Sequence, residues 1–135
     1  MARTRERLAV ARRALGTLQV LLTQPNPSDV VRDAAIQRFE YSFEATWKAA
    51  QTYLLEVEGV AAASPRAAIR GSYEVGRLAG DDTRTPLLLV DDRNLSVHTY
   101  NEALARTIFA RLGEHARVMA IWLEALEGAT PPEET

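Results

Sequence analysis

The residues best suited to chemistry lie together in the stretch Arg93-Asn94-Leu95-Ser96-Val97-His98-Thr99-Tyr100. The imidazole of His98 can act as a general acid or base near neutral pH, and the guanidinium of Arg93 can hold a phosphate with two parallel hydrogen bonds. The amide of Asn94 can orient either group, and the hydroxyl of Tyr100 can serve as a nucleophile or acceptor. Together these groups suit metal-independent cleavage of an RNA phosphodiester, in which the ribose 2′-hydroxyl loses a proton and attacks the neighbouring phosphorus.

Arg93 and His98 can act on one substrate only if the backbone turns between them. On an unbroken helix, five positions correspond to a rotation of about 140°, which directs the two side chains to different faces. Thr99 and Glu102 have the spacing of a capping box, with Thr99 as the N-cap and Glu102 at the third helical position. Ser96 favours the same break, because serine is a poor residue for a helix interior. We therefore expect Arg93 near the end of one helix and His98 in a tight connection before the next.

One chain supplies only one such histidine, whereas in-line cleavage needs both a base and an acid. A dimer with twofold symmetry would set two copies of the motif face to face in one cleft. The sequence contains no metal-ligand spacing and no glycine-rich phosphate loop, so we expect no metal and no cofactor.

Each motif residue also has a purely structural interpretation. Arg93 follows Asp91 and Asp92 and can be held in an ion pair, as arginines on helix surfaces commonly are. His98 can be an interface histidine, and Tyr100 can be a core residue. Spacing alone does not choose between these interpretations and catalysis.

The other charged residues are interpreted more simply. His115 stands between Glu114 and Arg117 in the middle of a predicted helix, and we interpret it as a solvated surface residue. Helix faces are normally charged. Two pairs of arginines could nevertheless form a patch that steers phosphates: Arg32 with Arg38, and Arg66 with Arg70.

Hydrophobic periodicity predicts two long helices in the first half of the chain. The first covers about residues 4–23. The second covers about residues 29–58 and ends at Gly59, because glycine adopts the left-handed conformation that terminates helices. Its apolar residues recur at intervals of three and four: Ile36, Phe39, Phe43, Trp47, Ala50, Leu54 and Val57.

Three further helices are predicted in the second half. One begins with Ser64 as N-cap and Pro65 at the first helical position and extends to about Leu78. The next starts near Thr85-Pro86, and the last extends to Gly128. The predicted fold is an all-α, up-and-down bundle of about five helices with long second and fifth helices. Residues 1–128 form one helical domain, and residues 129–135 form a flexible C-terminal tail.

Composition is consistent with a globular protein of 135 residues, with 47% hydrophobic and 25% charged residues. The absence of cysteine excludes disulfides, and no stretch has the length of a membrane span or the apolar core of a signal peptide. We therefore expect a cytoplasmic protein. A net charge of −2 argues against general coating of nucleic acid, but it leaves room for a local phosphate site.

Three blocks of the sequence resemble the HepT-like proteins of the HEPN superfamily, once called nucleotidyltransferase substrate-binding proteins. The resemblance covers about residues 8–126, and its last block fits the R-x4-H-x-Y pattern of that family, with the usual polar residue at Asn94. The blocks occur in the order of the family: residues 32–48 (RDAAIQRFEYSFEATWK), residues 64–70 (SPRAAIR) and residues 92–102 (DRNLSVHTYNE).

The resemblance implies a HEPN-like toxin of a toxin–antitoxin pair. Such proteins are metal-independent endoribonucleases that act through the motif arginine and histidine, here Arg93 and His98, at the cleft of a homodimer. The partner is a minimal nucleotidyltransferase (MNT) antitoxin, which silences the toxin by AMPylation of the motif tyrosine, here Tyr100. Residues 60–63 and 79–86 match no block of the family.

Two other functions remain open from the sequence. The older family name describes a non-catalytic subunit that binds a nucleotide or substrate for a nucleotidyltransferase, and this is the main alternative to the ribonuclease. The chain could also be an all-α dimerisation scaffold. Purified dimer that cleaves RNA, and loses this activity with His98→Ala, would exclude both alternatives.

Overall fold

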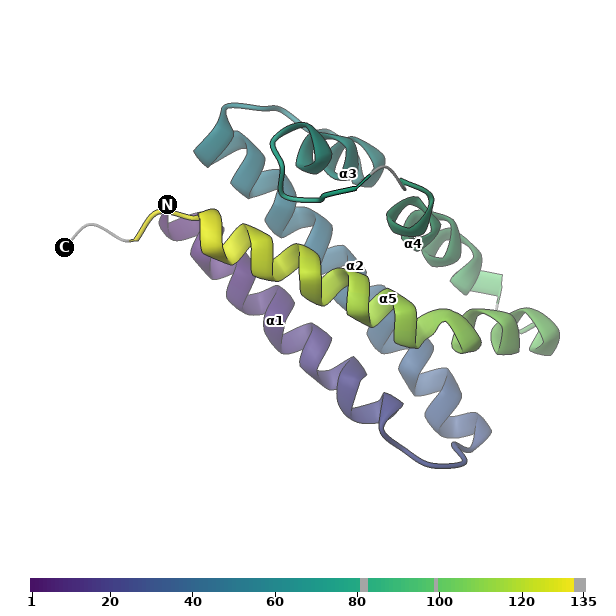
Figure 1. Ribbon diagram of the computed structural model, residues 1–135. Helices are drawn as coiled ribbons and strands as arrows, with labels where there is room; N and C mark the ends of the chain where they lie inside the picture. Colours follow the sequence, from purple (N-terminus) through teal and green to yellow (C-terminus); the bar gives the residue numbers. More distant parts are fainter. Residues whose placement is uncertain (81–82, 99, 133–135) are drawn as a thin grey trace.

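The computed structural model describes residues 1–80, 83–98 and 100–132, and this part of the chain contains helices and no strands (Figure 1). The predicted all-α fold with five α-helices is confirmed, and the second and fifth helices are long, as expected. The elements in chain order are α1 (Ala2–Leu22), α2 (Asp29–Glu58), α3 (Pro65–Glu74), α4 (Arg84–Leu95), the 3-10 turn η1 (Ser96–His98) and α5 (Glu102–Ala129).

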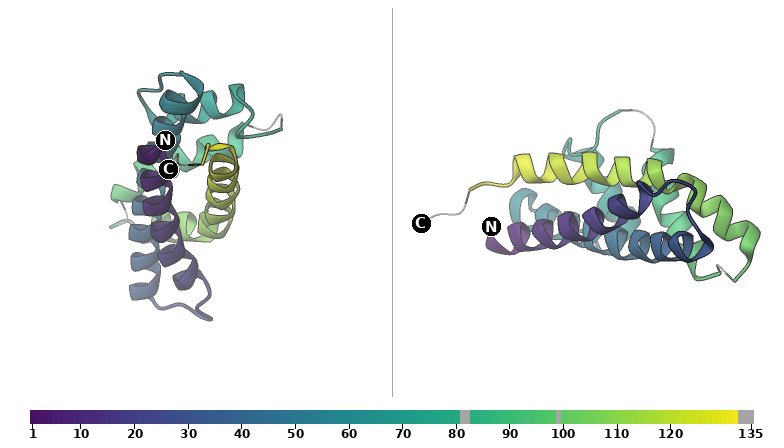
Figure 2. Two further views of the ribbon diagram at one scale, coloured as in Figure 1. Left: turned by 90° about the vertical axis from the view of Figure 1, so that its left-hand side faces the viewer. Right: turned by 90° about the horizontal axis from the view of Figure 1, so that it is seen from below.

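The three long helices α1, α2 and α5 form the body of the bundle and pack against one another. The short helices α3 and α4 lie beside one another on the side of α2 and α5 away from α1, as the views in Figures 1 and 2 show. The helix α4 touches both α2 and α5, so two long helices place it at once.

The core is built from the faces that the periodicity of the sequence indicates. On α2, six of the seven residues of the predicted stripe are buried, whereas Val57 near the end of the helix is only half-buried. The largest side chains that the core encloses completely include Phe39, Phe43 and Trp122. The indole of Trp122 donates a hydrogen bond of 3.0 Å to the hydroxyl of Ser72, which satisfies a buried polar group and links α5 to α3.

Two helix starts and one helix end agree with the residue types at these positions. The hydroxyl of Ser28 accepts a hydrogen bond from the backbone N–H of Val31, and Ser64 does the same for Ala67 at the start of α3. Gly59 follows α2 with a φ of 70°, in the left-handed region where glycine is not strained.

Helix α3 is shorter than predicted, because it ends at Glu74 and not near Leu78. The reason is Gly76, which has a φ of 79° and reverses the backbone. The turn brings the backbone N–H of Leu78 within 3.1 Å of the carbonyl of Ser72, and Leu78 still reaches the core. The inward position of Leu78 was therefore predicted correctly, although the prediction that it lies in a helix was wrong.

Both ends of α5 differ from the prediction. The helix begins at Glu102, and its N-cap is Asn101, whose amide oxygen accepts a hydrogen bond of 3.2 Å from the backbone N–H of Leu104. The predicted N-cap, Thr99, lies outside the described residues. Asparagine is as good an N-cap as threonine, and here it lies directly before the first helical residue. At the other end, Gly128 does not terminate the helix, which continues to Ala129.

The chain just beyond α5 is held against α1. The hydroxyl of Thr130 donates a hydrogen bond of 2.7 Å to the carbonyl of Leu126, and the guanidinium of Arg5 donates one of 2.9 Å to the carbonyl of Thr130. The start of α1 and the end of α5 therefore lie side by side (Figure 1). None of the described helices combines the length and the apolar character that crossing a bilayer requires.

Candidate functional site

The backbone turns between Arg93 and His98, as the sequence predicts. Arg93 lies in the last turn of α4, and His98 ends the 3-10 turn η1 that follows. The hydroxyl of Ser96 donates a hydrogen bond of 2.7 Å to the carbonyl of Arg93, and the backbone N–H of Asn101 donates one of 3.0 Å to the carbonyl of His98. We call residues 93–98, 100 and 101 the corner.

Arg93 is held by an ion pair, but its partner is not a neighbouring aspartate. Its Nη2 lies 2.8 Å from the carboxylate of Glu44 on α2, and its Nη1 donates a weaker hydrogen bond of 3.3 Å to the amide oxygen of Asn94. The structural interpretation that paired Arg93 with Asp91 or Asp92 is wrong, because Asp91 instead binds Arg66 at 2.8 Å. The guanidinium and the amide of the motif are thus in contact.

The aromatic groups of the motif point outward. The rings of His98 and Tyr100 have centroids 6.0 Å apart and meet edge to face, and both side chains are exposed. Tyr100 is 86% exposed, so its interpretation as a core residue is wrong. Among the described residues, no hydrogen bond or ion pair joins His98 to Arg93. Within one chain, the structure brings together Arg93 with Asn94 and His98 with Tyr100, and no hydrogen bond or ion pair between described residues links these two pairs.

The aspartate before Arg93 belongs to a buried ionic cluster that the sequence analysis missed. The carboxylate of Asp92 accepts two hydrogen bonds from Arg111, of 2.7 and 2.8 Å, and lies 2.6 Å from the Nε2 of His115. Asp92 is completely buried, and His115 is 1% exposed and stacks on Phe39. The interpretation of His115 as a solvated surface residue is therefore wrong.

The spacing of α5 contains a signal for this burial. The buried residues of α5 recur at intervals of four and three, and His115 occupies a position in this series: Ile108, Leu112, His115, Met119, Trp122 and Leu126. A histidine in such a stripe faces the core, where it needs a polar partner. Sequence alone could not identify Asp92 as that partner, because the contact joins two helices.

The environment of His115 favours its neutral form. Burial is the largest influence and lowers the pKa of the imidazole, and the positive charge of Arg111 lowers it further, whereas Asp92 acts in the opposite direction. The pKa of His115 is lowered overall because burial is the largest of these influences. The Nδ1 of His115 is buried and has no hydrogen-bond partner among the described residues, which suits an unprotonated nitrogen, since an N–H there would need an acceptor.

A second polar cluster surrounds Glu44 and is half-open to solvent. Besides the contact with Arg93, the carboxylate of Glu44 accepts a hydrogen bond of 3.1 Å from the indole N–H of Trp47. The ammonium of Lys48 lies 3.2 Å from the same carboxylate. Burial is the largest single influence on the pKa of Glu44 and raises it. The hydrogen bonds from Trp47 and Lys48 and the charges of Arg93 and Lys48 together outweigh burial, so the pKa is lowered. Glu44 is therefore ionised at neutral pH.

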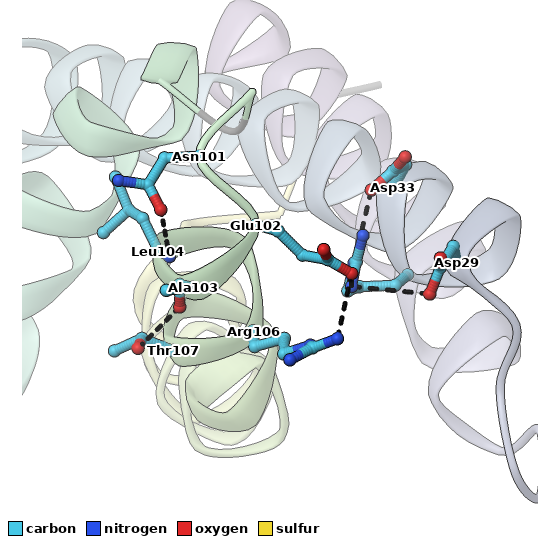
Figure 3. A network of polar contacts seen from close by, with 9 residues as sticks. Asp29, Asp33, Asn101, Glu102, Ala103, Leu104, Arg106 and Thr107 are labelled. Atoms are coloured by element: carbon cyan, nitrogen blue, oxygen red, sulfur yellow. Dashed lines mark hydrogen bonds and ion pairs between the residues drawn. The ribbon is translucent and has the colours of Figure 1, made fainter.

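A third cluster fixes the start of α5 to the start of α2 (Figure 3). The side chain of Arg32 is only 13% exposed and lies between the carboxylates of Asp29, Asp33 and Glu102, at 3.5, 3.4 and 3.7 Å. Arg106 adds a contact of 2.9 Å to Glu102. The corner is thereby anchored at its α5 end as well as at its α4 end.

The two predicted arginine patches are partly neutralised. The carboxylates around Arg32 and the ion pair of Arg66 with Asp91 cancel much of their charge, and the guanidinium of Arg38 lies 5.5 Å from the ring centre of Tyr41. This is the ordinary arrangement of charged helix faces. The described part of the chain contains no group of histidine, aspartate and glutamate residues that could hold a metal ion.

Comparison with solved structures identifies related folds. A protein of Thermus thermophilus shares 56% sequence identity with the chain, with a TM-score of 0.82 over 86% of this chain and 98% of that one. A protein of Haemophilus influenzae shares 22% identity, with a TM-score of 0.72 over 89% of this chain and 98% of that one. The fold of the latter is described as that of a substrate binding domain of a nucleotidyltransferase.

Comparison with curated proteins found no match. A family model described as "Nucleotidyltransferase substrate binding protein like" matches residues 6–128, which include the whole corner and all five helices except the first residues of α1 and the last of α5. The chain therefore belongs to the family of nucleotidyltransferase substrate binding protein like proteins.

Proposed function

We propose that this chain is the partner subunit of a minimal nucleotidyltransferase and that the corner enters the active site of that enzyme. The observation that carries the proposal is the exposure of Tyr100, which is 86% exposed on a corner anchored at both ends. When the phenol of Tyr100 reacts, a base must accept its proton. The ring of His98 lies beside it and can serve as that base. The family to which the chain belongs supports a nucleotidyltransferase as the partner.

The exposed phenol can accept a nucleotidyl group from ATP. Its oxygen attacks the α-phosphorus, a new oxygen–phosphorus bond forms, and pyrophosphate leaves with the bonding electrons. The phenolic proton passes to a base or to water, and the imidazole of His98 is the base that the corner itself offers. The product is Tyr100 that carries AMP, which adds bulk and negative charge beside His98.

Intact-protein mass spectrometry after incubation with the nucleotidyltransferase and ATP tests the proposal. We expect a mass gain in multiples of one AMP group, and no gain in the Tyr100→Phe variant. A stable complex without any mass gain would show that the chain only binds, and absence of both complex and mass gain would contradict the proposal.

A second candidate function is favoured by the joint presence of Arg93, Asn94 and His98 on the corner. In it, a homodimer acts as a HepT-like toxin of the HEPN superfamily and cleaves RNA without a metal. His98 of one copy removes the proton from the ribose 2′-hydroxyl, His98 of the other copy protonates the leaving oxygen, and Arg93 stabilises the charge on phosphorus. AMPylation of Tyr100 by an MNT antitoxin would then block the site.

RNA cleavage by the purified chain in the presence of a metal chelator separates the two functions. A ribonuclease cuts RNA under these conditions and loses the activity in both His98→Ala and Arg93→Ala. A partner subunit without catalytic activity leaves the RNA intact in the wild type and in both variants.

A further inference from the structure

Three hydrogen-bond donors from two helices converge on the carboxylate of Glu44. Arg93 Nη2 and Trp47 Nε1 lie 2.8 and 3.1 Å from Oε2, and Lys48 Nζ lies 3.2 Å from Oε1. Two cations and one neutral donor thus surround a single anion, which leaves the cluster with a net positive charge. Lys48 is also the only lysine of the chain, where every other basic residue is arginine.

The cluster is open enough for its anion to be exchanged. The side chains of Glu44 and Arg93 are each 36% exposed, and that of Lys48 is 42% exposed. Ion pairs with this exposure are weak, because water solvates both partners when they separate. The carboxylate of Asp92 is the opposite case, since it is completely buried and no solute can replace it.

The donors that hold Glu44 are those that proteins use to hold a phosphate. A planar guanidinium forms paired hydrogen bonds with phosphate oxygens, and an ammonium adds a point charge. A phosphate monoester carries a charge of about −1.5 to −2 at pH 7, more than the single charge of a carboxylate. A phosphodiester carries only one charge and gains little by exchange with Glu44. The cluster therefore favours a terminal phosphate over a phosphate inside a nucleic acid chain.

We propose that Arg93, Lys48 and Trp47 form a subsite for the terminal phosphate of a nucleotide, and that Glu44 is the internal competitor for this subsite. The inference deepens the proposed function and rests on it, because a nucleotidyltransferase handles nucleotides beside the corner. Arg93 connects the two sites, since its other terminal nitrogen binds Asn94 of the corner. Binding of the phosphate moves the carboxylate of Glu44 into solvent and leaves the three donors in place.

Calorimetric titration with AMP tests the role of Glu44. Glu44→Gln removes the competing charge but keeps an oxygen that can accept the indole N–H of Trp47. We expect AMP to bind roughly fivefold more tightly to this variant than to the wild type, equivalent to about 1 kcal/mol. The matched control is Glu40→Gln, one turn earlier on α2, which changes the net charge equally and should alter the affinity less than about twofold.

Further variants and ligands test the donors and the chemical class of the ligand. Lys48→Gln and Arg93→Gln, each combined with Glu44→Gln, should remove the gain in affinity for AMP. Adenosine should bind Glu44→Gln and the wild type equally, because it has no phosphate. Cyclic AMP should show a smaller gain in affinity than AMP, because its diester carries one charge. Circular dichroism verifies that each variant is folded.

Two results would overturn the subsite: equal affinities of Glu44→Gln and Glu40→Gln for AMP, or a gain that survives Lys48→Gln. The experiment is separate from the test of the proposed function. If the chain neither forms a complex with the nucleotidyltransferase nor receives AMP, but the titration shows the expected pattern, the proposed function fails and the subsite stands. If AMP is transferred and the pattern is absent, the subsite alone is wrong.

Discussion

The imidazole Nε2 of His115 lies 2.6 Å from the carboxylate of Asp92, the residue immediately before Arg93. Both side chains are buried, and Arg111 completes the cluster with two hydrogen bonds to the same carboxylate. The last turn of α4 is thereby fixed to the middle of α5. The direction in which Arg93 leaves the helix is consequently set by a buried ionic contact and by the pairing of Arg93 with Glu44.

Removal of the carboxylate in Asp92→Ala should lower the free energy of unfolding by about 3 kcal/mol, because the variant leaves Arg111 and a buried His115 without their partner. Urea unfolding at pH 7 measures the change. The control is Asp91→Ala, which removes an exposed carboxylate paired with Arg66 and should cost less than about 1 kcal/mol. Equal losses in the two variants would show that the buried cluster contributes little.

Stability should fall as the pH decreases from about 7 to 5, because burial lowers the pKa of His115 in the folded state. The unfolded chain then binds more protons than the folded chain in this range, so protonation favours unfolding, and the stability present above the unfolded-state pKa of about 6.5 is lost as the pH falls. Urea unfolding at a series of pH values measures the slope.

His115→Phe should reduce this slope, whereas His98→Gln, which removes the exposed histidine, should retain that of the wild type. A slope that disappears with His98→Gln would contradict the assignment to His115. The lowered pKa of Glu44 has its effect at more acidic pH, where carboxylates become protonated, so it does not obscure the range between about pH 5 and 7.

Tyr100→Phe should abolish the gain of AMP mass in the presence of a nucleotidyltransferase while it changes the free energy of unfolding by less than about 0.5 kcal/mol, because an exposed hydroxyl contributes little to stability. Mass spectrometry and urea unfolding give the two values. Tyr41→Phe, at another exposed tyrosine, should accept AMP as the wild type does. An AMP gain that persists in Tyr100→Phe would place the acceptor elsewhere.

Asn101→Ala should destabilise the protein by about 1 kcal/mol, since it removes the side-chain acceptor that caps α5. Thermal unfolding measures the loss. Asn101→Asp should restore most of the stability, because its carboxylate keeps the acceptor and interacts favourably with the helix N-terminus. If Asn101→Ala were as stable as the wild type, the cap of α5 would have to come from another residue.

Local signals in the sequence predicted most of the helices and the break at the corner. The stripe from Ile36 to Leu54 identified the buried face of α2, and Ser28, Gly59 and Ser64 marked helix boundaries, because caps and periodicity act between residues that are close in sequence. The same approach failed at α5, where two possible N-caps stand two residues apart. It also failed at α3, where the left-handed Gly76 ended the helix before the apolar pattern did.

The sequence by itself determined the all-α class, the chemical groups of the motif and the turn of the backbone between Arg93 and His98. Only the tertiary structure decided which partners the charged groups have. Asp92 binds Arg111 and His115, and Arg93 binds Glu44, although Asp92 and Arg93 are neighbours in the sequence and have opposite charges. The physical reason is that an ion pair forms where packing brings two side chains together, and the packing of α4 against α2 and α5 depends on apolar surfaces far apart in the chain.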